Sequence, residues 1–128
     1  MIDGTGADPV RNATLVFEGD TIVDVKRDGE VPRDAEVIDA GHLTVMPGMI
    51  DCHVHLASST WGVQERLLKP FSLLVAHALD HARITLEAGF TSVRDAAGTP
   101  RGVKMAIDQG LFPGPRLRIA VSATDQSS

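Results

Sequence analysis

Two histidines at the end of a short apolar run constrain the fold of this chain more than any other feature. The run extends from Val45 to Leu56, begins around Pro47-Gly48, and ends in His53-Val54-His55. A few apolar residues bounded by turn signals are typical of a buried strand, and residues i and i+2 of a strand face the same side about 7 Å apart. The two imidazoles are therefore predicted to share one face and to bind a zinc-type metal. The alternative is a pair of hydrogen-bonded core histidines.

A repeating order of strand and helix follows this run and predicts parallel βα units. A helix is expected from a cap at Ser72 to Ala88, closed by Gly89. The stripe that should pack this helix on the sheet consists of Val75, Leu79, Ala82 and Leu86. The next strand, helix and strand are expected at Thr91–Asp95, Arg101–Gln109 and Leu117–Val121.

Residues 1–46 are predicted to be rich in β-structure. Thr14–Glu18 and Thr21–Val25 flank Gly19-Asp20, a two-residue loop of the kind that closes a tight hairpin. Two further short strands are expected at Glu36–Asp39 and Leu43–Met46, on either side of a turn.

The segment Pro47-Gly48-Met49-Ile50-Asp51-Cys52-His53-Val54-His55, with Gly89-Phe90-Thr91-Ser92-Val93-Arg94-Asp95 downstream, carries a family resemblance. It resembles the opening of the metal-dependent amidohydrolase superfamily, especially the imidazolonepropionase-like and Xaa-Pro-dipeptidase-like branch. The implied fold class is α/β: the start of a (β/α)8 TIM-type barrel, residues 47–128, preceded by part of a small β-sandwich domain, residues 1–46. Because a complete barrel takes about 250 residues and the chain has 128, we expect an amino-terminal fragment, shortened at both ends.

The resemblance also implies a chemistry. His53 and His55 would be ligands of a divalent metal, commonly zinc, with one or two ions in the full-length enzyme. The implied reaction is hydrolysis of C–N bonds in an amide, cyclic amide or dipeptide-like small molecule through a metal-activated water. The other ligands and the catalytic aspartate would come from later strands, so the fragment alone is expected to be inactive. The alternatives are a phosphotriesterase-like or deaminase-like member of the superfamily, or a non-catalytic metal-binding fragment or subunit.

Three further residues are candidates for substrate binding. Arg94 and Asp95 end the second predicted strand, where barrel enzymes carry substrate-facing groups, and an ion pair within the barrel wall is the equal alternative. Trp61 lies in the loop after the histidines. It is predicted either to line a substrate pocket or to anchor its own loop.

Structural roles are predicted for the other polar residues near the histidines. Asp51 is expected to share their strand face and to hydrogen-bond neighbouring backbone, whereas Cys52 should be a small buried filler on the opposite face. His77 and His81 have the i, i+4 spacing that binds metals in some proteins. Their helical positions lie opposite the apolar stripe, which predicts a solvated outer face.

Composition narrows the setting. With 12 Lys+Arg against 17 Asp+Glu the formal charge is −5, and the sequence predicts no basic surface for nucleic acid. It has neither an apolar run of about 18 residues nor a signal-like start, so no membrane partner is expected. The single Cys52 agrees with a reducing, cytoplasmic compartment. A homo-oligomer is compatible with the full-length enzyme.

Overall fold

The structure is a computed structural model, and it describes residues 1–58 and 60–120. The chain divides into two units, Met1–Pro47 and Gly48–Ser128. The boundary lies one residue after the one expected from the sequence. Of the expected third barrel strand, the last residue, Val121, lies outside the described residues, as does the polar tail that follows it.

The first unit contains a β-hairpin. Strands β1 (Ala13–Glu18) and β2 (Thr21–Arg27) pair antiparallel, with Glu18 opposite Thr21, so that Gly19-Asp20 forms a two-residue loop. Gly19 has φ 62, a backbone conformation that glycine adopts without steric cost. The predicted hairpin is therefore confirmed.

The prediction of two other strands in the first unit is wrong. Within the described residues 28–48 no strand forms, and Ile38 and Leu43 are 86% and 72% exposed. A strand persists where its N–H and C=O groups find a neighbouring strand. In this segment a main-chain bond joins Ile2 N–H to the Val45 carbonyl at 2.9 Å, which is too little pairing to hold a sheet.

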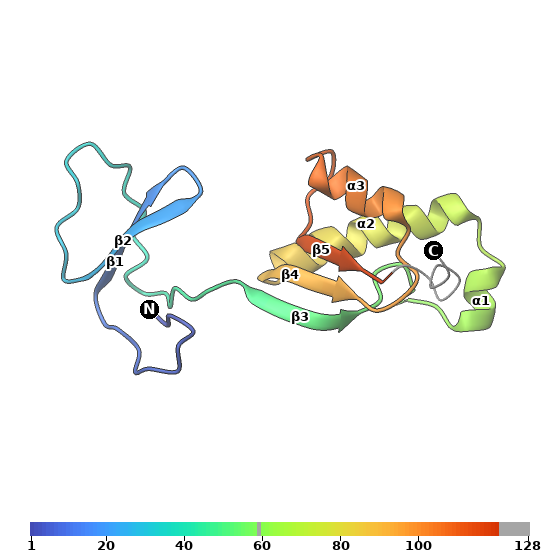
Figure 1. Cartoon of the computed structure of the whole chain (residues 1–128), viewed down its shortest axis with the longest axis horizontal. Helices are drawn as coiled ribbons and strands as arrows, with labels where there is room; N and C mark the ends of the chain where they lie inside the picture. Colours follow the sequence, from blue (N-terminus) through green and yellow to red (C-terminus); the bar gives the residue numbers. More distant parts are fainter. Residues whose placement is uncertain (59, 121–128) are drawn as a thin grey trace. The chain divides into compact units, whose positions relative to one another are not determined.

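The second unit is a three-stranded parallel sheet with its helices. Strands β3 (Met49–Val54), β4 (Phe90–Asp95) and β5 (Arg116–Ile119) are hydrogen-bonded in the order β3-β4-β5. Helices α1 (Val63–Leu67) and α2 (Phe71–Glu87) connect β3 to β4, and α3 (Arg101–Asp108) connects β4 to β5 (Figure 1). Alternating strands and helices around a parallel sheet confirm the predicted α/β class.

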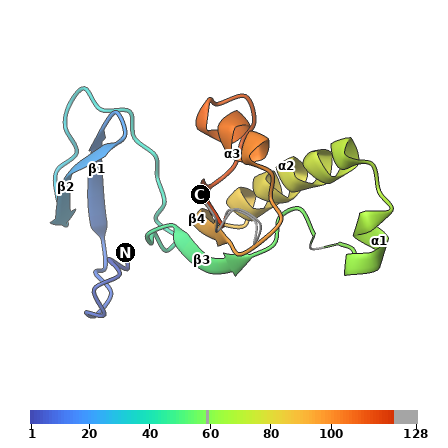
Figure 2. The same cartoon turned by 45° about the vertical axis from the view of Figure 1, so that its right-hand side comes forward.

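The core of this unit lies on one face of the sheet, under α2 and α3 (Figure 2). Val93 and Leu117 of the sheet are 2% exposed, and they pack with Ala78, Ala82 and Val103 of the two helices, which are fully buried. The two alanines lie one turn apart on α2, where their small side chains let the helix approach the sheet closely. The opposite face carries exposed side chains and is called the open face below.

The start of α2 differs from the prediction, and its end agrees with it. The helix begins at Phe71 after Pro70, and no side-chain bond caps it, so the prediction of a Ser72 cap is wrong. Proline needs no N–H partner at a helix start. At the other end Gly89 has φ 93 and terminates the helix as predicted. Among the described residues, no helix is long and apolar enough to cross a membrane.

Candidate metal centre

A β-bulge in β3 decides where the two histidines point. Asp51 is in register with Val93 and Val54 with Asp95, so β3 has three steps where β4 has two. Val54 packs against the core. His53 and His55, on either side of it, therefore both face away from the helices and lie on the open face.

The bulge corrects two predictions made from a period of two. Asp51 is paired with Val93, which is buried beneath the helices, so Asp51 does not share the face of the histidines. Its Oδ1 instead accepts the His53 N–H at 2.9 Å, the backbone bond that was expected. Cys52 is exposed rather than buried, because the extra residue of the bulge removes it from the covered face.

The two imidazoles are neighbours in space. Their ring centroids lie 5.1 Å apart with an interplanar angle of 81°. His53 is exposed and His55 is half-buried, and His55 Nδ1 lies 3.3 Å from the Ala97 carbonyl. Since a carbonyl accepts only, this contact favours the proton on Nδ1.

This donor set fits part of a zinc-type site. Two nitrogens bound to one tetrahedral ion lie roughly 3.4 Å apart, a separation that rings at this distance can reach. Within residues 1–58 and 60–120, no group of three or more His, Cys, Asp or Glu side chains is placed to hold a metal ion. The pair alone does not complete the three-residue protein ligand set that is typical of a catalytic zinc site.

The turn after the histidines folds back over the core. Leu56 and Ala57 are each 3% exposed. The Leu56 N–H donates to Asp95 Oδ2 at 2.8 Å, and its carbonyl accepts from His81 Nδ1 at 2.6 Å. Asp95 and His81 thus hold the residue next to His55 in the chain.

The surroundings of His77 and His81 differ from the prediction. Both are half-buried rather than solvated: His81 bonds to Leu56, and the His77 ring packs edge-on against Trp61 with centroids 4.4 Å apart. The prediction placed the centre of the apolar stripe too far round the helix, because it left out Ala78. With Ala78 fully buried, His81 lies on the flank of the stripe, where the loop after β3 passes.

Arg94 and Asp95 point to opposite faces of β4. Asp95 is fully buried, and its Oδ2 also accepts the Thr99 hydroxyl at 2.6 Å, whereas Arg94 is exposed on the open face. Among the described residues no ion pair joins them. Asp95 therefore connects the loops after β3 and β4, and Arg94 is left facing the side of the histidines.

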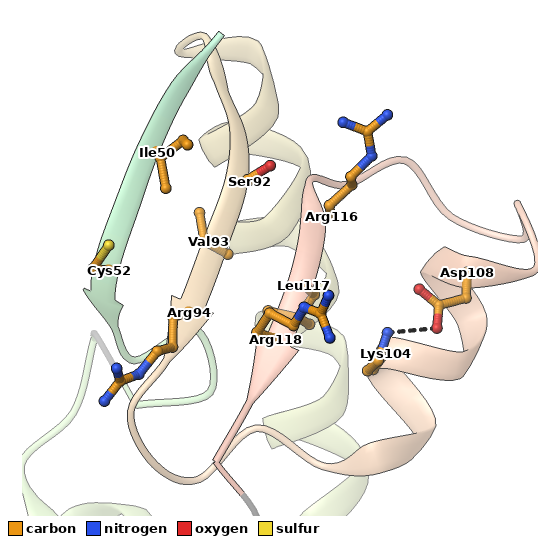
Figure 3. Close-up of a pocket in the computed structure, with 10 residues that line it drawn as sticks. All are labelled: Ile50, Cys52, Ser92, Val93, Arg94, Lys104, Asp108, Arg116, Leu117 and Arg118. Carbon is orange, nitrogen blue, oxygen red and sulfur yellow. Dashed lines mark hydrogen bonds and ion pairs between the residues drawn. The ribbon is translucent and has the colours of Figure 1, made fainter.

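A depression of about 560 Å³ extends over the open face (Figure 3). Arg94 and Arg118 leave their strands near the carboxyl ends, and Lys104 forms an ion pair of 2.6 Å with Asp108 beside them. The remaining residues that line it are Ile50, Cys52, Ser92, Val93, Arg116 and Leu117. The lining is therefore basic along its β4 and β5 side.

Trp61 is not among the residues that line this depression. Its ring contacts His77, and the Lys69 ammonium lies 5.7 Å from the ring centroid. This placement matches the anchoring interpretation, in which the aromatic ring attaches the loop to α2.

An ion-pair row lies further along α2. The Arg83 guanidinium donates to Asp80 at 2.8 Å and to Glu87 at 2.7 Å. The hydrogen bond from Arg83 lowers the pKa of Asp80, and those from Arg83 to Asp80 and Glu87 raise the pKa of the guanidinium. All of these groups are on the solvent side of the helix, so they affect the helix rather than the site.

Sequence reasoning missed three polar residues of the site: His81, Thr99 and Thr60, whose hydroxyl lies 3.1 Å from His81 Nε2. The alanine pair at 78 and 82 was the available signal for His81, because it shows how far the buried stripe extends. No local pattern marks the two threonines, which act through their contacts with His81 of α2 and Asp95 of β4.

Comparison with known proteins gives consistent matches. A family model described as the amidohydrolase family matches residues 44–127. Ochratoxinase from Aspergillus niger is 31% identical over 138 residues, which cover all of this chain and 28% of that protein. A crystal structure of an amidohydrolase has a TM-score of 0.80 at 33% identity, over 89% of this chain and 28% of the other.

A crystal structure of a Xaa-Pro dipeptidase with methionine bound in its active site has a TM-score of 0.73 at 29% identity. It covers 86% of this chain and 28% of that one. The chain therefore spans a little over a quarter of the length of each of these three proteins.

Proposed function

The chain belongs to the amidohydrolase family, and from this premise we propose that it forms the beginning of a metal-dependent hydrolase that cleaves C–N bonds. The proposed substrate is a small amide, cyclic amide or dipeptide-like molecule. In this proposal the three strands are the first of a (β/α)8 barrel, and the first unit is part of a β-sandwich domain. A cytoplasmic location stays a prediction from the sequence.

The observation that carries the proposal is the position of the two histidines. They lie side by side at the carboxyl end of β3, on the face that α2 and α3 leave open. Active sites of α/β barrels are built at the carboxyl ends of the strands. If later strands close the sheet, the open face becomes the barrel interior.

Each described residue then has a proposed role. His53 and His55 would hold a divalent metal, which when bound lowers the pKa of water and polarises a carbonyl. Arg94 is exposed on the same face, and its guanidinium suits a substrate carboxylate through paired hydrogen bonds. Asp95 and Trp61 hold the loops around the site and are proposed as structural residues rather than substrate contacts.

The proposal is tested by metal content and turnover in the full-length enzyme. His53→Ala and His55→Ala should each lower bound zinc and hydrolysis together, because each removes an imidazole ligand. The matched control is His42→Ala, whose side chain is exposed in a turn of the first unit. It should keep both properties.

The substrate panel separates the alternatives. It contains Xaa-Pro dipeptides, cyclic amides, a phosphotriester and an aminopurine nucleoside. Turnover of an amide supports the proposal. Turnover restricted to the phosphotriester or the nucleoside would assign the protein to the other hydrolase types, and full zinc content in both ligand variants would refute the metal assignment.

A further inference from the structure

The main chain of Leu56 is held at both of its polar groups by side chains from other elements. Its N–H donates to Asp95 Oδ2 at 2.8 Å, and its carbonyl accepts from His81 Nδ1 at 2.6 Å. Asp95 is fully buried at the end of β4, and Leu56 is 3% exposed. Water therefore competes poorly for these bonds, and they fix the residue that directly follows His55.

Each of the two holding side chains is itself oriented by a hydroxyl. The Thr99 hydroxyl donates to Asp95 Oδ2 at 2.6 Å, and the Thr60 oxygen lies 3.1 Å from His81 Nε2. Because the Leu56 carbonyl accepts only, His81 carries its proton on Nδ1. Its Nε2, in the neutral ring, then accepts the Thr60 hydroxyl. The ring of His81 has a bond at both nitrogens and one preferred orientation.

The buried carboxylate of Asp95 is also linked to the second contact of His55, which is the Ala97 carbonyl. The Ala97 carbonyl, 3.3 Å from His55 Nδ1, lies between Asp95 and Thr99, which are bonded to each other. The loop that receives the His55 ring and the peptide that follows His55 are thus attached to one carboxylate. His81, on α2, fixes the same peptide from the other side through the Leu56 carbonyl.

We propose that His81 is a positioning residue for the metal ligand His55. It acts through the Leu56 carbonyl, with Asp95 as the fixed hold on the other side. This inference rests on the proposed function, in which His55 binds a metal. Partners that orient a metal-binding histidine typically change metal affinity roughly 10-fold to 100-fold when they are removed, because the ligand loses its set direction.

The test compares three variants in the full-length enzyme. His81→Leu removes both ring bonds at similar volume. His81→Gln keeps an N–H for the Leu56 carbonyl and an oxygen for the Thr60 hydroxyl, so it should restore what the leucine variant loses. The matched control is His77→Leu, one turn earlier on α2, where the ring touches Trp61 and no bond to Leu56 is lost.

Two properties are measured: the zinc dissociation constant, by competition with a chelator, and the melting temperature of the metal-free protein. His81→Leu should weaken zinc binding by about tenfold or more, with His81→Gln close to the parent and His77→Leu unchanged. A change in the absorption spectrum of bound Co²⁺ in His81→Leu should accompany the weaker binding. A merely structural role would instead lower the melting temperatures and leave affinity and spectrum alone.

Parent affinity in His81→Leu, or an equal loss in His77→Leu, would overturn the inference. A second outcome separates the inference from the proposed function. If the parent protein binds zinc, the His55→Ala variant does not, and the His81→Leu variant binds zinc as the parent does, then the inference fails and the proposed function stands. If the parent itself binds no zinc, both fail together.

Discussion

Truncating one buried and one exposed side chain of the sheet tests whether the open face becomes a barrel interior. Leu117 is 2% exposed and packs in the core under α2 and α3, whereas Ile50 is 69% exposed and is not part of that core. Leu117→Ala and Ile50→Ala each remove three carbon atoms, worth about 0.8 kcal/mol apiece when buried. The cavity left behind adds to this and brings the usual cost to about 2–5 kcal/mol.

The expected cost of truncation depends on closure of the barrel at Ile50 but not at Leu117. Leu117 is already covered by α2 and α3, so Leu117→Ala should lower the free energy of unfolding by that amount in any setting. Ile50 is uncovered in the three-stranded sheet, where its truncation should cost less than about 0.5 kcal/mol. If the proposed barrel closes in the full-length protein, it buries Ile50, and the cost should rise to about 2–5 kcal/mol.

Denaturant unfolding of the full-length variants measures these costs, with Leu111→Ala as the control. Leu111 is 72% exposed in the loop after α3, and its truncation should be close to neutral. If Ile50→Ala were as mild as Leu111→Ala, the open face would not be a barrel interior. A mild Leu117→Ala would refute the assignment of the helix-covered face.

Two further predictions concern the strand entry and α2. Gly48→Ala should destabilise the protein by more than 1 kcal/mol, because its added Cβ would lie 2.1 Å from Thr91 Oγ1, whereas Gly62→Ala, with no atom within 4 Å, should be near neutral in the same thermal melts. Asp80 should titrate below an unperturbed aspartate in a carboxyl NMR titration, because Arg83 donates to it. The stability linked to this lowered pKa is therefore present above about pH 4 and is lost as the pH falls through the lowered value; an unchanged Asp80 titration in Arg83→Gln would contradict this cause.

Features set by neighbouring residues could be predicted from the sequence. The hairpin at Gly19-Asp20 follows from a two-residue loop between two apolar runs, and the end of α2 follows from a glycine at positive φ. The order of strands and helices after Gly48 follows from the same local periodicities. The predicted strands at 36–39 and 43–46 failed because a strand depends on a partner, which local sequence does not supply.

The part of the site that was missed depends on contacts between distant segments. The bulge in β3 exists only in relation to β4, some forty residues later, so a period of two gave the wrong faces for Asp51 and Cys52. His81 reaches a carbonyl 25 residues earlier in the chain. Its role therefore depends on where the loop after β3 passes over α2, which no pattern within the helix indicates.

The bulge between Asp51 and Val54 also limits how this segment can change during evolution. Removing one residue there would restore the regular alternation of side chains between the two faces of the strand. The histidines would then point toward the helix-covered side of the sheet. Two polar rings would then enter an apolar layer, and the outward face would lose both. Single-residue deletions in 51–54 should therefore abolish the site, whereas length changes in the loop around Leu111, which is 72% exposed, should be tolerated.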